Sequence, residues 1–90
     1  MATGTIKSQG LKSDTYSGTT DVGGDVALGI NKSSGKIVVS VSDRTGSSYM
    51  IIPRTVSNGD WYAHYEKYAG GNWVPATGAT AAGTYYYLDA

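Results

Sequence analysis

The stretch DWYAHYEKYAGGNW, residues 60–73, is the most aromatic part of the chain and decides the fold. Both tryptophans and three of the eight tyrosines lie in it, and residues 60–69 contain neither glycine nor proline. Aromatic residues are enriched in β-strands, where successive side chains point to opposite faces. We therefore expect a strand with two aromatic faces. The core face is predicted to hold Trp61, Ala63 and Tyr65, with Lys67 at its edge, and the other face Tyr62, His64, Glu66 and Tyr68.

The rest of the chain has turn-forming residues spaced as in an all-β domain. Thirteen glycines, together with many serines and threonines, divide it into short runs rich in β-branched and aromatic residues. No run has the period of a long helix, and the regular turn signals predict short strands. The expected strands are residues 5–8 and 12–16 on either side of Gly10, then 25–30, 36–42, 49–52 before Pro53, 61–68, a strand beginning at Trp73, and 84–88.

Most of these strands are separated by a few turn-forming residues. Such connections favour antiparallel pairing, because a parallel pair needs a long crossover. The Asn-Gly pair in residues 57–60 is a typical hairpin signal, whereas the low-complexity segment 75–83 is expected to be a loop. The predicted fold class is all-β: a small antiparallel β-sandwich or jelly-roll-like domain of about six to eight short strands. One domain covers residues 1–90, with an N-terminal strand region at 1–17 followed by residues 18–90.

The core of so short a chain must be small. Leu, Ile and Val make up only about a sixth of the residues and phenylalanine is absent, which is below the roughly 20% under which disorder becomes the usual interpretation. Basic and acidic residues balance, however, and aromatic residues reach 11%, so the composition is not that of a disordered chain. We expect a thin, tyrosine-rich core that is completed by association with further copies of the chain.

The charge balance restricts the partners. A net charge of zero and a pI near 6.5 give no electrostatic attraction for nucleic acid, and the basic residues are scattered rather than clustered. The start, MATGTIKS, has neither the basic nor the apolar region of a signal peptide, and no apolar run is long enough to span a membrane. We expect no nucleic-acid partner and no membrane insertion.

The sequence carries no pattern of catalytic residues. Asp60 and Glu66 would lie ~20 Å apart along a strand, whereas the paired carboxylates of a glycosidase lie ~5–10 Å apart. His64 is the only histidine and cysteine is absent, so a Cys-based zinc site is excluded and any Ser-His-Asp triad would depend on His64 alone. Asp21 and Asp25 flank a Gly-Gly loop but do not match the spacing of a calcium loop. We expect no enzyme activity, no cofactor and no metal.

The aromatic residues instead suggest a binding surface. Tyrosine and tryptophan give large, rigid contact areas, while serine, glycine and asparagine supply adaptable hydrogen bonds. Sugar rings stack their apolar faces on such aromatic planes, and nearby carboxylates and amides accept their hydroxyl hydrogens. The candidate ligand-binding residues are Tyr62, His64, Tyr68, Trp73, Asn72 and Asp60. A competing interpretation assigns the rings to the core, to cross-strand pairs or to a subunit interface, and makes His64 a polar residue on an exposed strand face.

Four segments also occur in a recognisable order. They are GGDVALGI at 23–30, KIVVSVS at 36–42, WYAH at 61–64 and YYYL at 85–88. In this order they resemble the C-terminal domains of bacteriophage and prophage tail-fibre or baseplate proteins, over about residues 18–90. The resemblance implies a small β-domain, usually trimeric, at the distal end of a fibre, where it joins three chains or binds a host-surface polysaccharide. It brings no catalytic residues with it.

Three interpretations of the function follow. The first is a non-enzymatic, homotrimeric tail-fibre-type module that recognises host cell-surface carbohydrate and is located in the virion or outside the cell. The second is a purely structural trimerisation or capping domain without a ligand. The third is a monomeric carbohydrate-binding or Ig-like module of a secreted bacterial protein. A monomeric mass in solution would count against the trimer, and the native flanking sequence would decide the third interpretation.

Overall fold

The computed structural model describes residues 10–89, and the strand expected at residues 5–8 lies outside them. The described residues contain seven strands and one short 3-10 turn, which confirms the all-β class. They are β1 (Leu11–Thr19), β2 (Asp25–Asn31), η2 (Lys32–Ser34), β3 (Lys36–Asp43), β4 (Met50–Thr55), β5 (Asp60–Ala69), β6 (Asn72–Pro75) and β7 (Thr80–Asp89). Within residues 10–89, no helix has the length and apolar character needed to cross a membrane.

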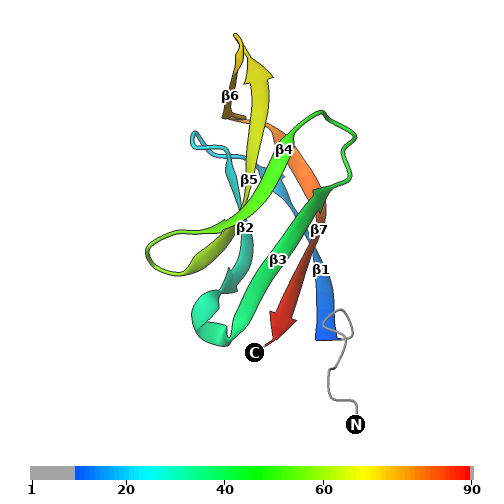
Figure 1. Ribbon diagram of the computed structural model, residues 1–90, viewed down its shortest axis with the longest axis vertical. Helices are drawn as coiled ribbons and strands as arrows, with labels where there is room; N and C mark the ends of the chain where they lie inside the picture. The colour runs from blue at the N-terminus through cyan, green and yellow to red at the C-terminus, as the bar shows by residue number, and fades with distance from the viewer. Residues whose placement is uncertain (1–9, 90) are drawn as a thin grey trace.

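The strands form two antiparallel sheets that pack as a small β-sandwich (Figure 1). The first sheet has the order β1-β7-β3, and β5 is the centre of the second, with β4 on one side and β2 and β6 on the other. β2 and β6 share one side because the Tyr65 N–H donates to the Gly24 carbonyl (2.8 Å) and the Tyr65 carbonyl accepts from the Ala76 N–H (3.0 Å). All strand pairs are antiparallel as predicted, but only β4–β5 and β5–β6 are neighbours along the chain.

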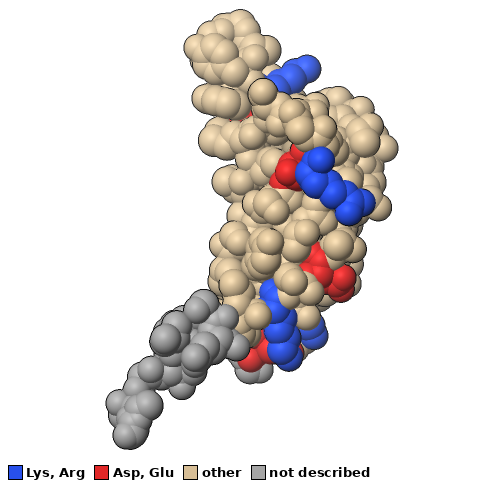
Figure 2. All heavy atoms as spheres, turned by 90° about the vertical axis from the view of Figure 1, so that its right-hand side faces the viewer, with Lys and Arg blue, Asp and Glu red and all other residues tan. Residues whose placement is uncertain are grey.

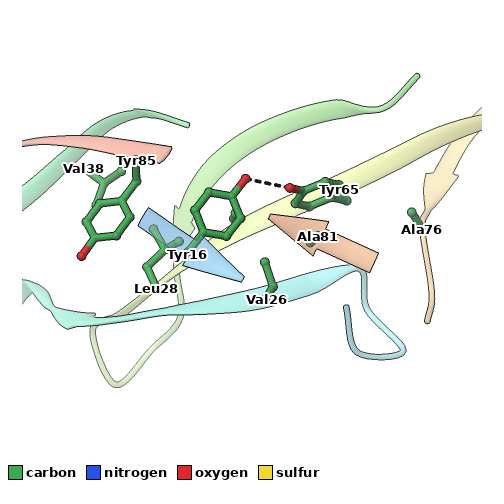
Figure 3. Close-up of a cluster of buried hydrophobic side chains, with 9 residues drawn as sticks. Tyr16, Val26, Leu28, Val38, Tyr65, Ala76, Ala81 and Tyr85 are labelled. Carbon is green, nitrogen blue, oxygen red and sulfur yellow. Dashed lines mark hydrogen bonds between the residues drawn. The ribbon is translucent and has the colours of Figure 1, made fainter. Parts of the chain in front are cut away.

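The core lies between the two sheets (Figure 3). It consists of Tyr16, Val38, Ala81 and Tyr85 from the first sheet, Val26, Leu28, Ala63 and Tyr65 from the second, and Ala76 after β6. Tyr65 is the largest fully buried side chain, and Trp61 is partly buried against the cluster, while Lys67 is exposed. The face of β5 that was predicted to be buried is therefore the core face.

Pro53 does not end β4, so the prediction of a strand that stops at residue 52 is wrong. The Val56 N–H donates to the Asp60 carbonyl (3.2 Å). Because backbone groups alternate along an antiparallel pair, residue 53 turns its backbone nitrogen away from β5. β4 is an edge of the second sheet, so a residue without an N–H removes no hydrogen bond from the sheet.

The segment 75–83 is not a loop throughout, because β7 begins at Thr80. β7 is the central strand of the first sheet, and its small residues let it fit between β1 and β3. Ala81 is only 1% exposed, and a Cβ added at Gly83 would overlap the carbonyl group of Ser42 in β3. The low complexity of this segment therefore reflects close packing of a central strand.

Candidate functional site

The hairpin of β5 and β6 carries two exposed aromatic rings. Tyr68 and Trp73 are cross-strand partners, and 62% and 48% of their surfaces are exposed. Their ring centroids are 5.4 Å apart, with 68° between the ring planes. This edge-to-face arrangement is one that aromatic pairs favour, so each ring helps to hold the other in place. The hairpin projects beyond the other strands at the top of Figure 1.

The turn of this hairpin fixes the position of the two rings. Gly70 and Gly71 form the two-residue loop, with φ angles of 60° and 83°. Positive φ at both positions is the mark of a type I′ turn, whose twist matches that of paired strands. Asn72, the first residue of β6, is exposed and pairs with Ala69. The structure thus places three of the candidate residues on one hairpin, with Tyr68 and Trp73 on one face and Asn72 on the other.

His64 lies on the outer face of the second sheet but is buried there, so the interpretation of an exposed polar residue is wrong. Its Nδ1 is 2.8 Å from Asp25 Oδ1 and its Nε2 is 2.9 Å from Glu66 Oε2. A neutral imidazole has one N–H, so either the ring is an imidazolium that donates to both carboxylates or one acid carries the shared proton. With both nitrogens engaged, His64 is unsuited to contact a ligand.

Arg54 completes this outer-face cluster. Its Nη2 donates to Asp25 Oδ2 at 2.8 Å. One oxygen of the buried Asp25 carboxylate therefore contacts the Arg54 guanidinium, and the other contacts the His64 ring. Buried carboxylates are tolerated when they are paired and hydrogen-bonded in this way. Asp21 does not join the cluster, because its Oδ1 accepts from the N–H groups of Gly23 and Asp25 and closes its own loop. Among residues 10–89, no three acidic or histidine side chains form a metal site.

The two remaining candidates lie away from the hairpin. Tyr62 is partly exposed on the outer face, where its cross-strand neighbours are Ala27 and Arg54. Asp60, at the start of β5, accepts a hydrogen bond from the Asn31 side chain (2.8 Å). Eight residues along a strand place it ~26 Å from Tyr68. The six candidates therefore do not form one site.

A second polar cluster lies inside the sandwich. The hydroxyl groups of Tyr16 and Tyr65 are 2.7 Å apart (Figure 3), and the Tyr65 hydroxyl donates to Asp43 Oδ1 at 2.8 Å. Tyr16 and Asp43 belong to the first sheet and Tyr65 to the second, so these hydrogen bonds join the two layers. Within the described residues, no buried side-chain nitrogen or oxygen lacks a hydrogen-bond partner.

Burial changes the acidity of this inner cluster. It is the main reason why the pKa of Tyr65 lies far above its ordinary value, and the hydrogen bonds with Tyr16 and Asp43 raise it further. Burial likewise raises the pKa of Tyr16. For Asp43 burial disfavours the carboxylate, but hydrogen bonds from Thr45, Tyr65 and Ala82 outweigh it and hold the pKa below the usual range. The phenols stay neutral and the carboxylate stays charged.

Several of these residues have no signal in the sequence. Asp25 and Arg54 looked like ordinary loop and surface residues, and only the pairing of β2 and β4 with β5 places them beside His64.

The surface charges are mixed in sign. On the face seen in Figure 2, basic and acidic side chains lie next to each other on a largely uncharged surface. That face has no region of a single sign.

Comparisons with protein-family models, with curated proteins and with solved structures found no match for this chain.

Proposed function

We propose that this domain is a carbohydrate-binding module of the phage tail-fibre type and that the Tyr68–Trp73 pair is its principal contact surface. The observation that carries the proposal is the exposure of two aromatic rings on a hairpin whose turn and edge-to-face contact fix them. Large apolar side chains are usually buried, so two that are exposed together and held rigid favour a binding role.

The chemistry around the rings favours a sugar over an apolar partner. Glu66 is partly exposed on the same face of β5 as Tyr68 and offers a hydrogen-bond acceptor, whereas Asn72 and Lys67 lie on the opposite face of the hairpin. Rigid rings flanked by polar groups fit a pyranose, which has an apolar face and a rim of hydroxyl groups. The resemblance of residues 18–90 to tail-fibre and baseplate domains is consistent with a polysaccharide on a host surface, and with a protein located in the virion or outside the cell.

An array of bacterial surface polysaccharides tests the proposal. We expect the unmodified protein to bind at least one glycan, and Tyr68→Ala and Trp73→Ala each to weaken that binding by at least about tenfold. Val22→Ala is the matched control, because it removes an apolar side chain that is 84% exposed in a different loop. Binding that survives in the Tyr68→Ala/Trp73→Ala double variant, or the absence of any bound glycan, would contradict the proposal.

A structural role in a trimer is the second candidate, and a different surface favours it. Leu88 of β7 pairs with Leu11 on one side and Ile37 on the other, which forms an apolar row on the outer face of the first sheet. Leu11 and Ile37 are exposed, as is Val39 beside them. Exposed apolar rows of this kind mark contacts between subunits.

Light scattering at micromolar concentration tests this candidate. We expect a trimer that dissociates in Ile37→Lys, because a lysine would bring a charge into the apolar row. Ser17 is exposed on the same face of β1 as Leu11, so Ser17→Lys is the control. A monomer would remove both the trimer and the structural role, and would leave a monomeric carbohydrate-binding module.

A further inference from the structure

A pocket of about 290 Å³ opens where β2 departs from regular pairing with β5. Ala27 pairs with Tyr62 and Asn31 with Asp60, so β2 advances by four residues where β5 advances by two. The extra residues of this bulge interrupt the regular pairing of β2 with β5 beside the pocket. The lining residues are Ala27, Gly29, Ile30, Asn31, Asp60 and Trp61.

The walls of the pocket are fixed by hydrogen bonds. The Trp61 indole Nε1 donates to the Lys36 carbonyl at 3.2 Å, which holds the ring in one orientation. Asn31 uses both hydrogens of its side-chain amide, toward Asn58 O (3.0 Å) and Asp60 Oδ1 (2.8 Å). Gly59 permits this close approach, since a Cβ added there would lie 2.9 Å from Asn31 Oδ1. A site whose side chains are already fixed loses little entropy when a ligand binds.

The polar groups of the lining are acceptors. With its amide hydrogens committed, Asn31 presents only its carbonyl oxygen, which already accepts from the Ser33 N–H (2.8 Å). Asp60 offers Oδ2, for which the described residues supply no donor. The Trp61 N–H is also in use, so the pocket has an aromatic wall and acceptors but no free side-chain donor. Such a lining suits a ligand that donates hydrogen bonds and disfavours an anion.

We propose that this pocket binds a single neutral polyol of pyranose size. Its hydroxyl groups donate to Asp60 and Asn31, and its apolar face lies against the Trp61 indole. The class of ligand in this inference rests on the proposed function. The residues do not, because the pocket and the Tyr68–Trp73 pair lie at opposite ends of β5. The domain would then contact a polysaccharide at two separate points, which strengthens binding when both are engaged.

The two tryptophans allow each site to be followed separately. Trp61 lies in the pocket and Trp73 in the hairpin, so a ¹H–¹⁵N spectrum has one indole signal for each, and Trp73→Phe assigns them. The probes are the methyl glycosides of glucose, galactose, mannose and N-acetylglucosamine. We expect at least one of them to shift the Trp61 indole signal and the Gly29 amide signal until saturation.

A variant that fills the pocket tests the location. Ala27→Leu places a larger side chain in the lining, and we expect it to weaken the response of Trp61 by at least about tenfold. Ser17→Leu adds similar bulk on the exposed face of β1 and is expected to leave the response unchanged. The response of Trp61 is also expected to persist in Tyr68→Ala, so a failure of the hairpin site and a failure of the pocket give different results.

Three results would overturn the inference. One is the absence of a saturable shift of Trp61 with every glycoside. Another is a shift caused by choline but by no sugar, which would make the ligand a cation. The third is a sugar response that Ala27→Leu leaves intact, which would place the ligand elsewhere.

Discussion

His64 and Tyr65 are adjacent in β5, and both are buried at the centre of a polar cluster, yet the two clusters stabilise different levels of structure. The Tyr65 cluster connects the second sheet to Tyr16 and Asp43 of the first. The His64 cluster joins residues of β2, β4 and β5, which all belong to the second sheet. Two neutral hydroxyl groups and the Asp43 carboxylate join the layers inside, and paired polar side chains join neighbouring strands outside.

Loss of the Tyr65 side chain is expected to have the largest effect. Tyr65→Ala removes the largest fully buried side chain and should lower the free energy of unfolding by ~3–5 kcal/mol. Tyr65→Phe keeps the ring, but it leaves Tyr16 and Asp43 without a shared partner and should cost ~1–3 kcal/mol. Urea unfolding followed by fluorescence measures both. A phenylalanine variant as stable as the unmodified protein would show that the hydroxyl does not help to join the sheets.

Loss of the His64 ring should have a smaller effect than Tyr65→Ala. In His64→Leu the Asp25 carboxylate keeps Arg54 as a partner, and Glu66 is exposed enough to be solvated, so we expect a loss of ~1–3 kcal/mol. Ile52→Ala is the control, because residue 52 is the cross-strand neighbour of His64 and is half exposed. The same unfolding measurement applies. A loss no larger than that of Ile52→Ala would mean that the outer cluster adds no stability.

The smallest effect is expected in the dependence of the unfolding free energy on acid pH. The pKa of Asp43 is lower in the folded protein than in the unfolded chain, so its contribution is complete above the unfolded pKa of ~4 and is lost as the pH falls through the folded value. The difference in unfolding free energy between the unmodified protein and Asp43→Asn should therefore shrink below about pH 4. A series of urea titrations from neutral to acid pH measures it, and a constant difference would contradict the assignment.

The sequence predicted the two faces of β5 because that pattern is local. Strand alternation placed Tyr65 in the core and Tyr68 outside, and the strands expected at 61–68 and from Trp73 left the turn between them to residues 69–72, where Gly70 and Gly71 form it. These features depend on residues that lie close together along the chain. The exposed aromatic pair could therefore be predicted from the order of residues alone, including Trp73 on the second strand of the hairpin.

The sequence could not predict which strands pair across long separations. The burial of His64 depends on Asp25 and Arg54, which reach it only through the register of β2 and β4. Residues 80–83 looked like a loop because small residues occur both in loops and where strands pack closely. In both cases the deciding contact lies in a distant segment, and for Gly83 it is the backbone of Ser42.

The position of β7 has a consequence for how the chain acquires its structure. β7 is the centre of the first sheet, yet it follows β1 and β3 in the chain, and the pair Leu11–Leu88 connects residues 77 positions apart. During synthesis β1 and β3 therefore leave the ribosome with no strand to pair with. The second sheet can form early through its two hairpins, whereas the first must wait for Thr80–Asp89. Until then the backbone N–H and C=O groups of β1 and β3 that will pair with β7 are free to pair with other chains. The chain is therefore most exposed to aggregation in the interval before β7 emerges.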